Sequence, residues 1–182
     1  MPRGCYYWEY RVGLTYRARG RCSGRVEELS NLPPPTADAR VRHLYDHWIG
    51  LHPAPGLLPG RQHFDPVALP VALLPFLWLA DVQRAPLRFR YRLLGTEHVR
   101  VLGRDHTGRW IDEAHPDFLG STAYAQFVAA AERGEPGYRR GHTLIIMPED
   151  YRSMERLILP LARNGRDVDM LLAISVYHRE EE

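Results

Sequence analysis

The clearest helical pattern in the chain lies between residues 36 and 50. Apolar side chains recur there at helical spacing and form one stripe, made of Val41, Leu44, Tyr45, Trp48 and Ile49. Thr36 or Asp38 can cap the start of this helix, and Gly50 with Pro53 ends it. The stripe allows two interpretations: the helix packs on its own domain, or it forms an interface with a second copy or a partner protein.

A second pattern, with a period of two, predicts strands in the remainder of the chain. Two strands joined by a short turn are expected, at 76–83 and 87–94. Helical segments follow, at 96–102, 110–118 and 121–133. Three more strands are expected, at 138–147, 152–162 and 168–177. Asn164 and Gly165, between the last two, are a strong hairpin signal.

This order predicts an α+β fold: a five-stranded antiparallel sheet with helices on one face and an N-terminal amphipathic helix. Three consecutive prolines at 33–35 can neither continue a helix nor join a sheet, so they place the domain boundary at about residue 35. We therefore expect a flexible tail and linker over 1–35, a folded domain over 36–178, and an acidic end at 179–182.

Composition narrows the class of protein. The 182-residue chain is 45% hydrophobic and 25% charged, which suits one domain with a real core and excludes a disordered chain. It has no apolar stretch long enough to span a membrane and no signal-like start, so we expect a cytoplasmic protein. Residues 1–26 carry a net charge of +5 and the remainder −3. An acidic domain argues against a nucleic-acid surface outside the arginine-rich tail.

Both cysteines, Cys5 and Cys22, lie in the predicted tail, and neither belongs to a pattern typical of a zinc site. The expected domain therefore has no thiol nucleophile and no thiolate ligand for a metal centre. We predict no metal site in it.

Short motifs punctuate the expected domain. They read LYDHW at 44–48, PGLLPGR at 55–61, FDP at 64–66, LRFRYRLLGT at 87–96, GRDHTGR at 103–109 and ERLILPL at 155–161. Together they resemble the PAS family of sensor domains, and in particular the PAS_5-type group of single-domain proteins from alphaproteobacteria. The resemblance implies a domain that binds a small molecule between sheet and helices, or that dimerises through the outer sheet face and the N-terminal helix. It carries over no catalytic residues.

The residues argue against several cofactors that PAS domains use. A flavin adduct and a covalently attached chromophore each need a cysteine in the core, and haem needs an axial histidine, which helix 121–133 lacks. His98, His106 and His115 precede that helix, and we interpret them as surface or capping residues because nothing in their spacing places them on one face. The identity of any cofactor stays open.

A ligand pocket between sheet and helices would have aromatic walls, and the candidates are Phe89, Tyr91, Trp110, Phe118, Tyr124 and Phe127. The polar groups that would orient a ligand are Arg109, His142 and Arg156. A buried Arg156 needs a counter-charge. A carboxylate ligand or an ion pair, for example with Asp81, would supply it, and we favour the ion pair.

We therefore predict a single-domain PAS-type sensor or adaptor and not an enzyme. It would bind a small apolar or amphipathic molecule, or a protein partner, and signal through association as a homodimer or with a signalling protein. One alternative is a small α+β hydrolase or isomerase that uses Asp112 and His115 as acid and base. Another is nucleic-acid contact through the arginine-rich tail.

Overall fold

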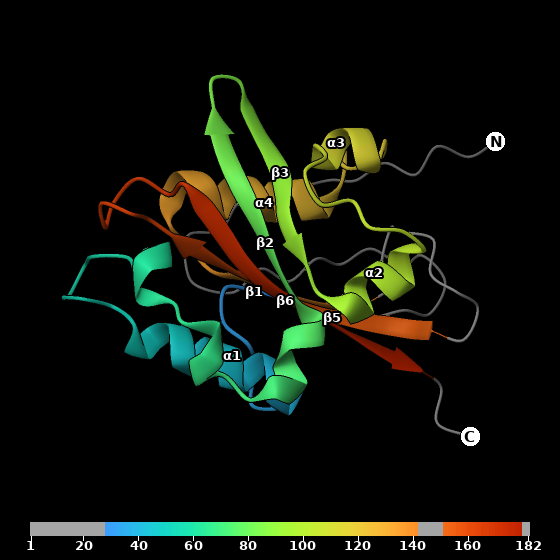
Figure 1. The fold of residues 1–182 in the computed structure, drawn as a ribbon, viewed down its shortest axis with the longest axis horizontal. Coiled ribbons are helices and arrows are strands. Elements are labelled where there is room, and N and C mark those ends of the chain that lie inside the picture. The colour runs from blue at the N-terminus through green and yellow to red at the C-terminus, as the bar shows by residue number, and fades with distance from the viewer. Residues whose placement is uncertain (1–27, 142–150, 180–182) are drawn as a thin grey trace.

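The computed structural model describes residues 28–141 and 151–179. These residues form one six-stranded antiparallel sheet with helices packed on it (Figure 1). The strands are β1 (Glu28–Ser30), β2 (Leu77–Arg84), β3 (Leu87–Leu94), β4 (Gly137–Gly141), β5 (Tyr151–Leu161) and β6 (Met170–Arg179). Their order across the sheet is β1-β4-β5-β6-β2-β3, so the two hairpins β2–β3 and β5–β6 lie side by side.

Helices connect the two hairpins and precede them. The α-helices are α1 (Ala39–Gly50), α2 (Thr96–Leu102), α3 (Ile111–Ala114) and α4 (Thr122–Arg133). Short 3-10 helices lie between α1 and β2, at η1 (Arg61–His63), η2 (Pro66–Ala68) and η3 (Val71–Phe76). None of the helices in the described ranges is long and apolar enough to cross a membrane.

Local signals in the sequence act at the expected helix ends. The Asp38 carboxylate accepts a hydrogen bond from the Arg40 backbone N–H at the start of α1. The Ser121 hydroxyl accepts the corresponding hydrogen bond from the Tyr124 N–H in α4, and Gly134 ends that helix with a left-handed backbone, φ +67°.

The antiparallel sheet with helices packed on it confirms the expected α+β class.

The expected strand count is wrong, because the sheet has six strands and not five. The extra strand, β1, lies in the segment expected to be a flexible tail, and Leu29 pairs there with Arg139 of β4. Three residues are too few to show an alternating pattern, so only pairing with β4 identifies this strand. The domain therefore begins before the predicted boundary at 35. Residues 1–27, with Cys5, Cys22 and most of the arginine-rich tail, lie outside the described residues.

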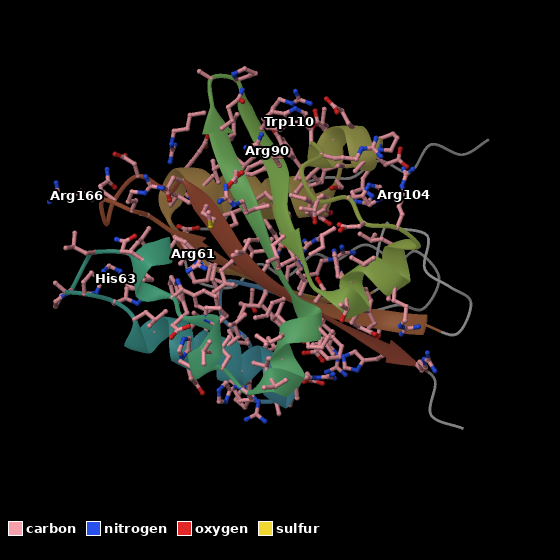
Figure 2. All side chains as sticks on the ribbon, viewed as in Figure 1. Arg61, His63, Arg90, Arg104, Trp110 and Arg166 are labelled. Carbon is pink, nitrogen blue, oxygen red and sulfur yellow. The ribbon has the colours of Figure 1, made fainter. Side chains whose placement is uncertain are left out.

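The N-terminal helix, for which no face was predicted, lies on the opposite face of the sheet from α4. Side chains fill the space on both sides of the sheet (Figure 2), with α1 and η3 packed on one face and α4 on the other. Both faces of β5 are consequently buried: Leu157 and Leu159 face α1, and Ile158 between them belongs to the core under α4. The unbroken apolar run in ERLILPL is the sequence signature of a strand buried on both faces.

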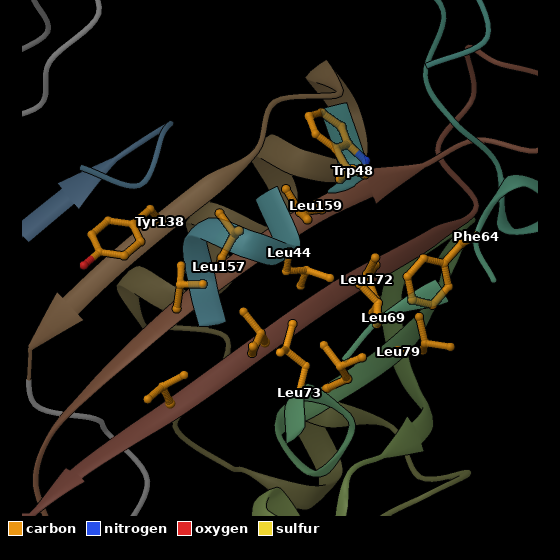
Figure 3. Packing of buried hydrophobic residues seen from close by; sticks show 14 of the residues in the cluster. Leu44, Trp48, Phe64, Leu69, Leu73, Leu79, Tyr138, Leu157, Leu159 and Leu172 are labelled. Atoms are coloured by element: carbon orange, nitrogen blue, oxygen red, sulfur yellow. The ribbon is translucent and has the colours of Figure 1, made fainter. Parts of the chain in front are cut away.

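The apolar stripe of α1 forms part of the protein's own core (Figure 3). Val41, Leu44 and Trp48 are buried against β5 and β6, and the Trp48 indole donates a 3.0 Å hydrogen bond to the Pro160 carbonyl. These three residues are therefore unavailable to a second copy or a partner. The predicted interface role is wrong for them, because the outer sheet face needs the same apolar surface as its cover. Tyr45 is half-buried beside them, and Ile49 is exposed.

A buried carboxylate anchors the start of α1 to the sheet. Glu155 Oε2 accepts hydrogen bonds from the Asp38 backbone N–H at 2.8 Å and from the Tyr138 hydroxyl at 3.0 Å. His178 Nε2 lies 3.1 Å from Oε1, and Arg140 Nε lies 3.7 Å from it. Burial alone would raise the pKa of Glu155, but the hydrogen bonds outweigh burial and hold the pKa below its ordinary value.

The two ends of the α1 stripe should respond differently to truncation. We expect Leu44→Ala to lower the free energy of unfolding by about 2–5 kcal/mol, because it leaves a cavity in the core. Ile49→Ala, on the same helix but 47% exposed, should change it by about 0.5 kcal/mol or less. Urea unfolding of both variants measures the difference. Equal effects would mean that the helix does not pack on the sheet through Leu44.

Loss of the Glu155 charge should destabilise the fold by about 2–4 kcal/mol, since Glu155→Gln leaves several donors with a weaker acceptor. Because the pKa of Glu155 is lowered, its contribution is present above the unfolded value of 4.5 and is lost as the pH falls through the folded value. The matched control is Glu113→Gln, which removes an exposed pair with Arg88 and should cost about 1 kcal/mol or less. Thermal unfolding at pH 7 that ranks the two variants equally would contradict the anchoring role.

Candidate functional site

A cavity of about 330 Å³ lies between the sheet and the segment from α2 to α4. Its apolar walls come from Trp78, Tyr91, Leu102, Ile111, Ala114, Pro116, Phe118, Ala123, Phe127 and Met154. Its polar lining comes from His98, Arg104, His106, His115, Asp117, Ser121, Arg139, Arg156 and Ser175. A closely packed interior has few voids larger than a water molecule, so a space of this size with convergent polar groups is a candidate ligand site.

The floor of the cavity is the polar end of the central strands. In the sheet register, Arg156 of β5 lies between Arg139 of β4 and Ser175 of β6. All three are buried on the same face as α4. Two residues further along β5, the same face turns apolar, where Ile158 pairs with Ala173. The alternation of the strands therefore places a polar patch next to an apolar core within one layer.

The loop between α2 and α3 closes the cavity by pairing with β3. The Gly108 N–H donates to the Tyr91 carbonyl at 2.7 Å, and the Tyr91 N–H donates to the Arg109 carbonyl at 3.0 Å. Gly95 brings the start of α2 against η3, since a Cβ there would lie 2.3 Å from the Pro75 carbonyl oxygen. Arg104 lies at the outer edge of this loop (Figure 2), where the exposed lining residues mark the mouth of the cavity.

His98 of α2 is buried in a stack of aromatic rings. Its ring lies 5.8 Å from that of Trp78, nearly parallel to it, and Trp78 stacks in turn on Phe127 at 5.6 Å. His98 Nδ1 shares a short hydrogen bond with the Tyr177 hydroxyl. The other ring nitrogen, Nε2, is buried and has no hydrogen-bond partner among the described residues.

Two further histidines surround Tyr91. His115 Nε2 lies 3.0 Å from the Tyr91 hydroxyl, and the rings of His106 and His115 are 5.4 Å apart. The Arg104 guanidinium donates a 3.2 Å hydrogen bond to His106 Nε2. His106 Nδ1 is buried, and no described residue offers it a partner.

The protein keeps these imidazoles neutral. Burial lowers the pKa of His98 to about 3 and that of His115 to about 4, and neighbouring charges add to the effect. Burial, followed by Arg104 and Arg109, also lowers the pKa of His106. At neutral pH each ring therefore has one N–H donor and one acceptor nitrogen.

Of the candidate ligand residues, the structure brings Tyr91, Phe118, Phe127 and Arg156 to the cavity. Phe89 and Tyr124 pack in the core beside it, and neither lines it. Trp110 and Arg109 do not line it either, and Trp110 lies on the outer side of β3 under Arg88 and Arg90 (Figure 2). His142 lies outside the described residues.

The expected ion pair of Arg156 with Asp81 is also wrong. Asp81 pairs with Arg90 at 3.0 Å on the exposed side of the β2–β3 hairpin. Arg156 Nη2 instead donates to the Gln126 side-chain oxygen at 2.7 Å. Asp81 and Arg156 belong to strands separated by β6, so register keeps them apart.

The interpretation of the three histidines as surface or capping residues is wrong. His98 and His106 are each only 3% exposed, and His115 bonds to buried Tyr91. Their spacing of eight and nine residues gave no sign of this, because the loop at 103–110 folds back onto β3 between them. An apolar neighbourhood at His98, in the helix Thr96–Leu102, is the one local signal that could have indicated burial.

In the alternative acid–base pair, each side chain bonds to another residue: Asp112 accepts a 3.1 Å hydrogen bond from Arg88, and His115 Nε2 lies 3.0 Å from the Tyr91 hydroxyl. In the described ranges, the structure also has no group of three His, Cys, Asp or Glu side chains arranged to hold a metal ion. The described lining of the cavity brings neutral imidazoles and guanidinium groups together.

Comparison of the chain with models of known families, with curated proteins and with solved structures found no match. The cavity and the residues that line it are therefore the features from which a function can be inferred.

The neutral state of the cavity histidines can be measured by nitrogen NMR. We expect the ring nitrogens of His98 and His115 to keep neutral chemical shifts down to about pH 5, given pKa values of about 3 and 4. In urea, the same rings should titrate near the ordinary pKa of about 6.5. The stability that these rings contribute is therefore present above about pH 6.5 and is lost as the pH falls toward 4. Titration of His98 near pH 6.5 in the folded protein would contradict its burial.

Proposed function

We propose that this protein is a single-domain sensor or adaptor of the PAS type, which binds a small molecule in the cavity between its sheet and the α2–α4 segment. The observation that carries the proposal is the cavity of about 330 Å³, lined by aromatic rings and by buried polar groups. Buried polar atoms normally have hydrogen-bond partners, and His98 Nε2 and His106 Nδ1 have none among the described residues. A bound molecule would supply them.

The order of the elements supports the PAS assignment. Two strands, a helical segment and three strands follow one another from β2 to β6, as the resemblance implies. The cavity lies between the sheet and that helical segment, where the resemblance expects a ligand. The outer sheet face differs from the expectation, since α1 and η3 of the same chain cover it. Dimerisation through the buried stripe of α1 is therefore not part of the proposal.

The segment from α2 to α3 is the part of the fold best placed to respond to a ligand. It supplies His98, His106 and His115 to the cavity, and two backbone hydrogen bonds through Tyr91 hold its loop to β3. A ligand that bonds to these rings would stabilise one position of the segment relative to the sheet. The signal would then pass by association with a second copy or with a signalling protein.

Native mass spectrometry of freshly purified protein tests the proposal, since a bound species should be present and should be lost on denaturation. Ala123→Leu, which adds an isopropyl group inside the cavity, should abolish that species. Ala125→Leu on the exposed side of α4 is the matched control and should retain it. Circular dichroism establishes that both variants fold.

Two results together would overturn the proposal. The first is wild-type protein without any bound species. The second is a melting temperature that no fraction of a small-molecule extract from the native cell raises, because a ligand that binds only the folded state must raise it.

A further inference from the structure

The hydrogen-bond donors that line the cavity indicate what class of molecule fills it. This inference rests on the proposed ligand-binding function and concerns the chemistry of the ligand. It starts from the two buried histidine nitrogens that lack partners, His98 Nε2 and His106 Nδ1. Whether each is a donor or an acceptor depends on which nitrogen carries the proton, and the partners of the opposite nitrogens decide that.

At His106 the tautomer follows directly from the hydrogen bond to Arg104. The Arg104 guanidinium has donors only, and it bonds to Nε2. Nε2 must therefore accept, and the proton of the neutral ring is on Nδ1. The unpartnered Nδ1 is consequently an N–H donor, on a residue that is 3% exposed and lines the cavity.

At His98 the bond to Tyr177 leads to the same result. Burial raises the pKa of Tyr177, so the phenol keeps its proton. A phenol O–H is a stronger donor than a neutral imidazole N–H, and an imidazole nitrogen accepts more strongly than a phenol oxygen. We therefore assign Tyr177 as the donor in its short hydrogen bond to His98 Nδ1. The proton of His98 is therefore on Nε2, which is the second unpartnered N–H donor.

We infer that the cavity binds a small aromatic carboxylate, whose two oxygens accept the hydrogen bonds of His98 and His106. A carboxylate has acceptors only, which suits a site that presents two buried donors. The charged residues of the lining agree with this assignment. Among the described residues that line the cavity, Arg104, Arg139 and Arg156 are cations and Asp117 is the one carboxylate.

The volume and the apolar lining of the cavity indicate the size of the ring system that the ligand carries. A cavity of about 150 Å³ holds one benzene molecule, and this cavity has about 330 Å³. Two fused rings with a carboxylate therefore fit in volume. Ile111, Phe118 and Phe127 supply apolar and aromatic surface for such rings.

A pair of isosteric probes tests the carboxylate assignment in the wild-type protein. We expect 2-naphthoate to bind at least about tenfold tighter than 2-naphthamide by isothermal titration calorimetry at neutral pH, because charge-assisted hydrogen bonds are stronger and the amide NH₂ meets donors. An amide that binds as tightly as the acid would overturn the assignment. Failure of both probes to bind would overturn it as well. In either case a bound species in the native mass spectrum would leave the proposed function standing.

Variants of His98 and His106 test whether their N–H donors cause the preference for the acid over the amide. His98→Phe and His106→Phe keep a flat ring and remove the N–H, so each should reduce naphthoate affinity about tenfold and leave naphthamide affinity nearly unchanged. His43→Phe, on the exposed side of α1, is the control and should change neither. His98→Phe also removes the bond to Tyr177, so His106→Phe serves alone if His98→Phe does not fold. Unchanged acid-over-amide selectivity in the folded His106→Phe variant would contradict its role.

Long-range nitrogen–proton NMR tests the tautomers without any ligand. We expect the proton on Nε2 of His98 and on Nδ1 of His106. The opposite tautomer at both residues would turn both unpartnered atoms into acceptors and overturn the inference.

Discussion

β5 and β6 form the longest ladder of the sheet, and side chains cover both of its faces. On one face, Leu157, Leu159 and their neighbours in β6 pack under α1 and η3. On the other, Ile158 and Leu171 pack under α4. A register slip of one residue would exchange the two faces and mismatch both cores at once. The Asn164–Gly165 turn, with φ +80° at the glycine, lies in the connection 162–169 that joins the two strands.

The same ladder sets the place of the cavity. Along the α4 face of β5 and β6, apolar side chains give way to Arg156, Ser175 and Tyr177 toward one end. A tightly packed apolar core cannot continue over such groups, because each buried polar atom needs a partner. The fold accommodates them by leaving a space there and by closing it with α2, α3 and their connecting loop. One face of the sheet thus carries both an apolar core and the cavity.

Local sequence signals were sufficient for most of the elements. The strict alternation in LRFRYRLL determines β3, and the caps Asp38 and Ser121 mark the starts of α1 and α4. Arg156, Tyr91, Phe118 and Phe127 were identifiable as candidate cavity residues because inward strand and helix positions follow from the period. The three histidines were not, because the loop between α2 and α3 has no period. Hydrogen bonds to the edge of β3 decide where its side chains go.

The sequence by itself determined the α+β class, the order of the strands and helices, and the apolar faces, since each depends on residues a few positions apart. Only the tertiary structure decided that α1 covers the outer face of its own sheet, that Glu28–Ser30 adds a sixth strand, and that Asp81 lies far from Arg156. It also brought His98 to Tyr177 and His106 to Arg104, the partners on which the tautomers of the two rings depend. The physical reason is that strand pairing and buried hydrogen bonds join residues from distant parts of the chain, and no local pattern records which partner each will meet.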